Sequence, residues 1–197
     1  MAEKTLDKTG IVIGRFQVFH NDHLRYVLAG KSLCDNLVIG ITNPDPTYFK
    51  DDSSDPHRSL VSSNPLSYFE RYVMLKSVMR ENGISYMDFS IVPFPINTPE
   101  IYCYYVPMSA VAYITVYDRW GQRKLELLKS GGLHTRVLWE KPAIEKGITG
   151  SEVRRRIALN EPWEHLVPKS IAALIKDWNL ESKLRVKPTV PFDKGLG

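Results

Sequence analysis

The most constraining feature of this sequence is its opening unit, which runs from residue 10 to residue 42. The apolar run GIVIG predicts a buried strand, DHLRYVLAGKSLC carries apolar residues at helical spacing, and DNLVIGIT predicts a second buried strand. A strand, a helix and a strand in that order form a βαβ unit, whose strands are parallel and whose crossover is right-handed. The start of the chain therefore predicts an α/β layer fold.

The rest of the chain alternates strands and helices in the same way. Further strands are expected at DFSIVPFPI, AVAYITVYD and TRVLWE, and helices at LSYFERYVMLKSVMRENG, WGQRKLELLKSGG, TGSEVRRRIALN and WEHLVPKSIAALIKDW. This alternation predicts an α/β, Rossmann-like three-layer sandwich with a mostly parallel five-stranded sheet. We expect one domain over residues 1–180 and a C-terminal tail over 181–197. Proline, serine and aspartate over 43–65 predict an inserted loop.

Two histidines and an arginine occupy the turn after the first strand, in the stretch GRFQVFHNDH. In parallel sheets ligands bind beyond the carboxyl ends of the strands, which is where this turn is expected. His20 and His23 stand three residues apart at the start of the predicted helix, so both can face one ligand. Free N–H groups at a helix start favour anions, and imidazoles add donors near neutral pH. The turn therefore predicts a site for a phosphate chain.

A second anion site is indicated by the later stretch ITGSEVRRRI. Thr149 or Gly150 can cap a helix that begins near Ser151, and a hydroxyl followed three residues later by Glu152 is a capping-box pattern. A helix start that also presents Ser151 and Arg154 suits phosphate. Taken alone, the run of three arginines is also compatible with a solvated helix face.

Both stretches resemble signatures of the HxGH nucleotidyltransferase superfamily, and the pattern is most similar to nicotinamide-mononucleotide adenylyltransferases of the archaeal type. GRFQVFHNDH is similar to the family start GRFQPFHxGH, and ITGSEVRRRI is similar to ISGTEIRRRM. NEPWEHLVPKSIAALI resembles the closing segment GEPWEDLVPKSVVEFI. The resemblance covers roughly residues 10–42 and 147–176, and it implies an enzyme that transfers a nucleotidyl group.

The resemblance implies a role for each matching residue: the histidines hold the triphosphate, the arginine of GRF contacts phosphate, and the second signature grips the β- and γ-phosphates. The implied catalytic residues are His20, His23 and Arg154, and the implied nucleotide-binding residues are Gly14, Arg15, Phe16, Thr149, Gly150 and Ser151. One position departs from the family, because the glycine between the histidines is here Asp22. A carboxylate beside phosphate is unfavourable unless it points away or helps to hold Mg²⁺. No other protein ligand for a metal is expected.

The middle of the chain, which selects the acceptor, departs from the adenylyltransferase pattern. PINTPEIYCYYVP keeps an asparagine of the family's PDINNNAIWVP but has tyrosines in place of its tryptophan, and VYDRWGQRKLELL stands where the family has TGN. An arginine at a strand end suits a phosphate or phosphonate, although a surface ion pair and wall positions for the tyrosines are equally compatible. The expected acceptor-binding residues are Asn97, Tyr104, Asp118, Arg119 and Trp120.

Three functions stay open at this point. The first is an adenylyltransferase that makes a dinucleotide, the second is a cytidylyltransferase that activates a small phosphorylated alcohol or phosphonate, and the third is an inactive nucleotide-binding protein. In either reaction the acceptor oxygen attacks the α-phosphate of an NTP bound to Mg²⁺, and pyrophosphate leaves. The expected partners are ATP or CTP and a small phosphate- or phosphonate-bearing acceptor.

Composition disfavours several other classes. The net charge is only +4, and no aromatic-basic motif indicates nucleic acid. No apolar run approaches the roughly 18 residues that span a membrane. The two cysteines lack metal-ligand spacing and the N-terminus lacks an apolar signal core, so we expect reduced thiols in or near the core of a cytoplasmic protein. A homo-oligomer is compatible with this composition.

Overall fold

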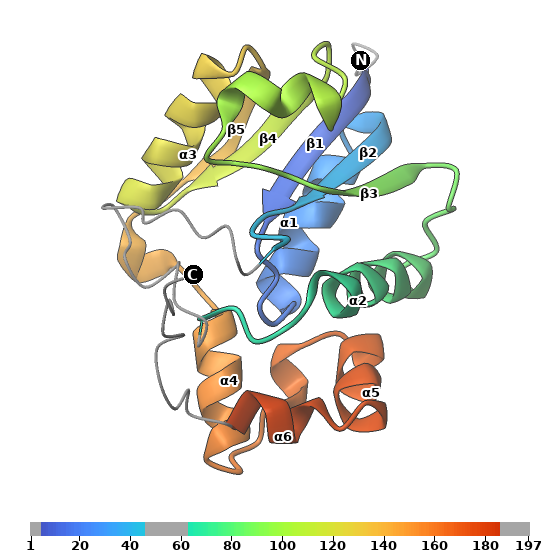
Figure 1. Ribbon diagram of the computed structural model, residues 1–197, viewed down its shortest axis with the longest axis vertical. Helices are drawn as coiled ribbons and strands as arrows, with labels where there is room; N and C mark the ends of the chain where they lie inside the picture. Colours follow the sequence, from blue (N-terminus) through green and yellow to red (C-terminus); the bar gives the residue numbers. More distant parts are fainter. Residues whose placement is uncertain (1–4, 46–62, 186–197) are drawn as a thin grey trace, which may run out of the picture.

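A parallel sheet organises the molecule. The computed structural model describes residues 5–45 and 63–185, and within them five strands form one sheet in the order β3-β2-β1-β4-β5 (Figure 1). The strands are β1 (Asp7–Gly14), β2 (Cys34–Ile41), β3 (Phe89–Pro93), β4 (Val111–Val116) and β5 (His134–Glu140). Every neighbouring pair is parallel, so the predicted α/β fold and five-stranded sheet are confirmed, without an antiparallel pairing among the described residues.

Helices cover both faces of this sheet. On one face lie α1 (Asn21–Lys31) and α2 (Tyr68–Glu81), and on the other lie η4 (Pro99–Tyr104) and α3 (Arg119–Ser130) (Figure 1). Val12 of β1 belongs to the buried cluster beneath α1 and α2, whereas Ile11 and Ile13 belong to the cluster beneath α3. Successive side chains of a strand point to opposite faces, which is why one short apolar run serves two cores.

Three further helices pack together beyond the carboxyl end of the sheet: α4 (Gly150–Ala158), α5 (Lys169–Asp177) and α6 (Leu180–Arg185) (Figure 1). The short helices η5 (Ala143–Glu145) and η6 (Glu164–Leu166) lie in the connections. Residues 181–185 were expected in the tail, but Leu180 and Leu184 are buried in the cluster that α4 and α5 share, so α6 is part of the core. The rest of the predicted tail and most of the predicted loop lie outside the described residues.

A buried arginine fixes the carboxyl ends of two strands. Arg71 of α2 donates to the carbonyl oxygens of Arg15, Thr42 and Asn43 at 3.0, 2.7 and 2.8 Å. Its Nε donates to the carbonyl of Ser67, the N-cap of α2, at 3.1 Å. Burial lowers the pKa of the guanidinium to about 10, so it remains charged at neutral pH. These bonds determine where the first βα turn leaves the sheet.

Two smaller expectations can be compared with the structure. Cys34 is buried as expected, but Cys103 is exposed, and both are free thiols. Within the described ranges no helix is long and apolar enough to cross a membrane.

Candidate active site

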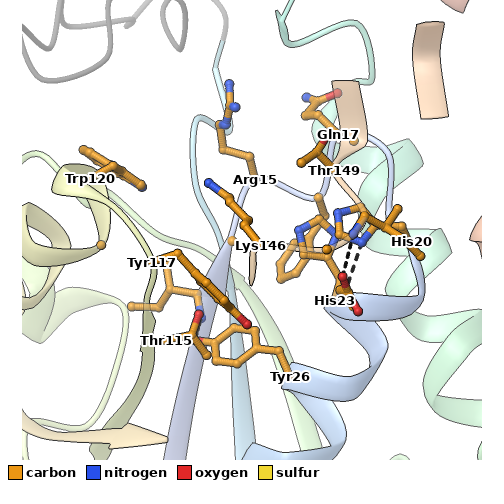
Figure 2. A pocket seen from close by; sticks show the side chains of 18 of the residues that line it. Arg15, Gln17, His20, His23, Tyr26, Thr115, Tyr117, Trp120, Lys146 and Thr149 are labelled. Carbon is orange, nitrogen blue, oxygen red and sulfur yellow. Dashed lines mark hydrogen bonds between the residues drawn. The ribbon is translucent and has the colours of Figure 1, made fainter. Parts of the chain in front are cut away.

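A cavity of about 370 Å³ lies between the first βα turn and the start of α4. Figure 2 shows the histidines of α1 on one side of this space and Tyr117 and Trp120 on the other. All of the predicted catalytic and nucleotide-binding residues line it: Gly14, Arg15, Phe16, His20, His23, Thr149, Gly150, Ser151 and Arg154. The two signatures, far apart in the sequence, therefore face one space.

The two histidines are held by the start of α1. His20 is the N-cap, and its Nδ1 accepts the backbone N–H of His23 at 3.4 Å. Because Nδ1 accepts, the neutral ring of His20 carries its proton on Nε2. The rings stack with their centroids 3.6 Å apart, and the buried Nδ1 of His23 has no hydrogen-bond partner among the described residues. The pair thus retains hydrogen-bonding capacity for a ligand.

Burial keeps both imidazoles neutral in the free protein. It lowers the pKa of His20 to about 4, although the charge of Asp22 acts in the opposite direction and that of Lys146 in the same one. It also lowers the pKa of His23 well below its ordinary value, and His20 and Arg15 add to this effect. A bound polyanion favours the charged form of a nearby imidazole, so the pair can take up positive charge as phosphate arrives.

The first βα turn and the start of α4 are in direct contact. Arg154 donates through Nη1 to the carbonyl oxygen of Gln17 in the first turn, and through Nη2 to Ser151 Oγ at 3.1 Å. Gly150 lies so close to the backbone of Gln17 that a Cβ there would collide with its carbonyl group. Glycine is therefore the residue that this approach allows.

The predicted capping box at α4 is only half formed. Thr149 is the N-cap, and its Oγ1 accepts the backbone N–H of Glu152 at 3.1 Å. The carboxylate of Glu152 does not return to the N-cap, because it pairs with Arg155 and Arg156 at 2.8 Å. Of the three consecutive arginines, only Arg154 lines the cavity, and the other two form surface ion pairs.

Asp22 lines the cavity in place of the glycine of the motif. Its Oδ2 accepts the backbone N–H of Ile148 at 2.7 Å, and its Oδ1 lies 3.7 Å from Arg25 Nη2. In the part of the chain that is described, no group of three or more His, Cys, Asp or Glu is placed to hold a metal ion. The carboxylate that we considered as a metal ligand is thus engaged by the protein backbone.

The expected acceptor-binding residues divide into two sets. Asp118 and Trp120 line the cavity, whereas Arg119, Asn97 and Tyr104 do not. Arg119 follows Asp118, the N-cap of α3, and is exposed. Binding of the acceptor by these three residues therefore stays a prediction.

The tyrosines of the segment PEIYCYY point in different directions. Tyr102 in η4 is fully buried and donates its hydroxyl to the carbonyl of Ile96 at 2.6 Å. Two residues further along this helix, Tyr104 is 82% exposed. The short helix thus directs one tyrosine into the core and the other to solvent.

Several residues that line the cavity were not predicted from the sequence. Lys146 Nζ lies 2.6 Å from Asp118 Oδ2, and Trp139 of β5 donates its Nε1–H to Tyr117 Oη at 2.5 Å. Lys124 of α3 also lines the cavity. Lys146 stands two residues before the second signature and Tyr117 directly before Asp118, so proximity to motifs was the one signal that could have found them.

The fold and the site together define a nucleotidyltransferase. The chain belongs to the cytidylyltransferase-like family, whose model matches residues 11–156. It is 42% identical over 185 residues to a phosphonoformate cytidylyltransferase from Streptomyces viridochromogenes, with 94% of this chain and 100% of that protein covered. It is 30% identical over 172 residues to a nicotinamide-nucleotide adenylyltransferase from Thermococcus kodakarensis, with 86% and 83% covered.

A solved structure supports the fold. The bifunctional NMN adenylyltransferase/ADP ribose pyrophosphatase from Francisella tularensis superposes with a TM-score of 0.61 at 16% identity. The alignment covers 91% of this chain and 53% of that one, so this chain spans about half of the bifunctional protein. A second structure of the Francisella protein is complexed with AMP and a manganese ion, and its TM-score is also 0.61.

Proposed function

We propose that this protein is a cytidylyltransferase that transfers CMP from CTP to a small phosphonate or phosphate. The observation that carries the proposal is the 42% identity to a phosphonoformate cytidylyltransferase over the entire length of that protein. Identity to the nicotinamide-nucleotide adenylyltransferase from Thermococcus kodakarensis is 30% and spans less of both chains.

The cavity supports a compact, anionic acceptor. Of the residues expected to bind the acceptor, Tyr104 is exposed and Asn97 lies outside the lining. The lining contains two lysines beyond the predicted cations, Lys124 and Lys146. A phosphonate that also bears a carboxylate has two anionic groups for such side chains to bind.

The proposed reaction is one in-line displacement. An oxygen of the acceptor's phosphonate attacks the α-phosphorus of CTP, and a new P–O bond forms. The bond from that phosphorus to the bridging oxygen of the β-phosphate breaks, and pyrophosphate leaves with the electron pair. His20, His23 and Arg154 stabilise the charge that grows on the leaving group, as preorganised donors do. No covalent intermediate with the protein is required.

Mg²⁺ fits this scheme as part of the substrate. Mg²⁺ prefers oxygen ligands and commonly keeps water while it binds substrate phosphates. The cavity carboxylates both have protein partners: Asp22 binds Ile148 N–H, and Asp118 binds Gly121 N–H at 2.9 Å as well as Lys146. We therefore propose that the ion enters as the Mg²⁺ complex of the nucleotide, held chiefly by phosphate oxygens.

The test is pyrophosphate release from the purified full chain. CTP, ATP, GTP and UTP are each supplied with Mg²⁺ and either phosphonoformate, a phosphorylated alcohol or nicotinamide mononucleotide. We expect turnover with CTP and a small acceptor. Turnover with ATP and nicotinamide mononucleotide would support the adenylyltransferase instead, and absence of turnover with every pair would overturn the proposal.

A further inference from the structure

We propose that Asp22 and Gly147 form a matched pair that positions the start of α4 against the first βα turn. Asp22 is then a positioning residue for nucleotidyl transfer, acting through the residues that follow Gly147. The inference rests on phosphate binding at this site and not on which nucleotide is used.

The contact joins the two anion-binding segments. Asp22 lies in the first turn of α1, and its Oδ2 accepts the N–H of Ile148 across 126 positions of sequence at 2.7 Å. Ile148 directly precedes Thr149, the N-cap of α4. A carboxylate bound to this N–H thus fixes the backbone immediately before the helix start that presents Ser151 and Arg154.

Gly147 is the other half of the pair. A Cβ built at this residue would collide with Oδ2 of Asp22. The HxGH pattern has its glycine between the two histidines, whereas this chain has the carboxylate there and a glycine opposite it. Asp22 can therefore reach Ile148 only because residue 147 has no side chain.

A second attachment holds α4 to the turn. It is the bond from Arg154 to the carbonyl of Gln17, beside the close approach of Gly150. Two attachments restrain both the position and the rotation of a helix start, and a misplacement of about 1 Å at a transfer site can reduce turnover by about 10²-fold. Loss of Asp22 is thus expected to affect phosphate binding although Asp22 itself repels phosphate.

Electrostatics and positioning make opposite predictions for Asp22→Ala. Removal of a carboxylate beside a phosphate site strengthens anion binding if charge alone matters. If the carboxylate positions α4, the same substitution weakens binding despite the gain in positive charge. Asp35→Ala is the matched control, because Asp35 is exposed at the start of β2 and lies outside the lining.

The experiment is a double-mutant cycle in the full chain, with two readouts. The first is calorimetric affinity for inorganic tripolyphosphate with Mg²⁺, which does not depend on the base. The second is pyrophosphate release with whichever substrate pair the wild type turns over, so that failure of the CTP assignment leaves the first readout intact. We expect Asp22→Ala to weaken tripolyphosphate binding about 10-fold, Asp22→Asn to recover most of it, and Asp35→Ala to match the wild type.

Gly147→Ala tests directly whether Asp22 and Gly147 act as a pair. In the wild-type background the added methyl displaces the carboxylate from Ile148 and should reproduce the loss seen in Asp22→Ala. In the Asp22→Ala background the methyl has nothing to displace, so the same change should have little further effect. Additive losses, or tripolyphosphate affinity in Asp22→Ala equal to or tighter than that of the wild type, would overturn the proposal.

Discussion

At the scale of single residues, His20 and His23 are the first donors proposed to stabilise the leaving pyrophosphate. Replacement of either by asparagine removes a donor aimed at the triphosphate, and we expect turnover to fall on the order of 10²-fold while the fold persists. Pyrophosphate release and thermal unfolding measure the two effects. His134→Asn is the control, because His134 is exposed at the start of β5. Wild-type turnover in both site variants would refute the assignment.

The buried imidazole of His20 also predicts a pH dependence of stability. The pKa is about 4 in the folded chain and about 6.5 when unfolded, so between these values the unfolded state holds a proton that the folded state lacks. Stability conferred by the neutral ring is present above pH 6.5 and is lost as pH falls toward 4. Urea unfolding over this range gives the free energy of unfolding as a function of pH. For His20→Asn the slope of this free energy against pH should be smaller than that of the wild type by up to about 1.4 kcal/mol per pH unit. Equal slopes would show that His20 is not held neutral.

Arg154 and Arg155 are neighbours with different environments. Arg154 reaches Ser151 and the first turn, whereas Arg155 pairs with Glu152 and Glu161 on the surface. Arg154→Lys replaces the planar guanidinium and its paired N–H donors by a single ammonium group. It should raise the KM for the nucleotide or lower kcat by 10-fold or more, which is roughly the effect of one charged hydrogen bond. Arg155→Lys should leave both constants within about twofold, since surface ion pairs contribute little. Equal effects of the two substitutions would contradict the geometry.

The residue scale also shows what sequence can and cannot predict. His20, His23 and Arg154 were predictable because their motifs tie chemistry to a helix start. The partner of Asp22 was not, because it is a backbone N–H 126 positions away whose approach depends on the packing of α4. The exposure of Tyr104 was not predictable for a related reason: residue type indicates stacking ability, but the phase of η4 decides which tyrosine faces the core.

At the scale of elements, α6 makes the clearest prediction. Leu184 is buried against α4 and α5, so Leu184→Ala should lower the free energy of unfolding by about 2–5 kcal/mol. Leu159→Ala is the matched control, because Leu159 is 59% exposed at the end of α4, and it should stay within about 0.5 kcal/mol. Urea unfolding measures both, and a negligible effect at Leu184 would mean that α6 does not belong to the core.

The strands and longer helices were predictable because each carries a periodic apolar pattern over eight or more residues, or a short buried run between turn residues. The helix α6 has six residues and one buried pair, Leu180 and Leu184, which is too short a pattern to separate from a charged tail. The tertiary contacts that hold it are those with α4 and α5, and periodicity carries no information about them.

At the scale of the whole molecule, we propose that two helix starts bind one triphosphate. The parallel sheet allows this arrangement, because β1 ends at the carboxyl edge of the sheet and the first turn follows it there. The contact between Gly150 and Gln17 places the start of α4 at the same edge. The order of the two motifs predicted the class of enzyme. That the two motifs face one cavity depends on the fold of the whole chain.

The most direct test is a crystal structure of the full chain with Mg²⁺ and a CTP analogue whose α–β bridging oxygen is replaced by a methylene group. We expect phosphate oxygens within hydrogen-bond distance of a ring nitrogen of His20 or His23 and, at the same time, of Ser151 or Arg154. A triphosphate that contacts only one of the two helix starts, or that binds outside this cavity, would contradict this expectation.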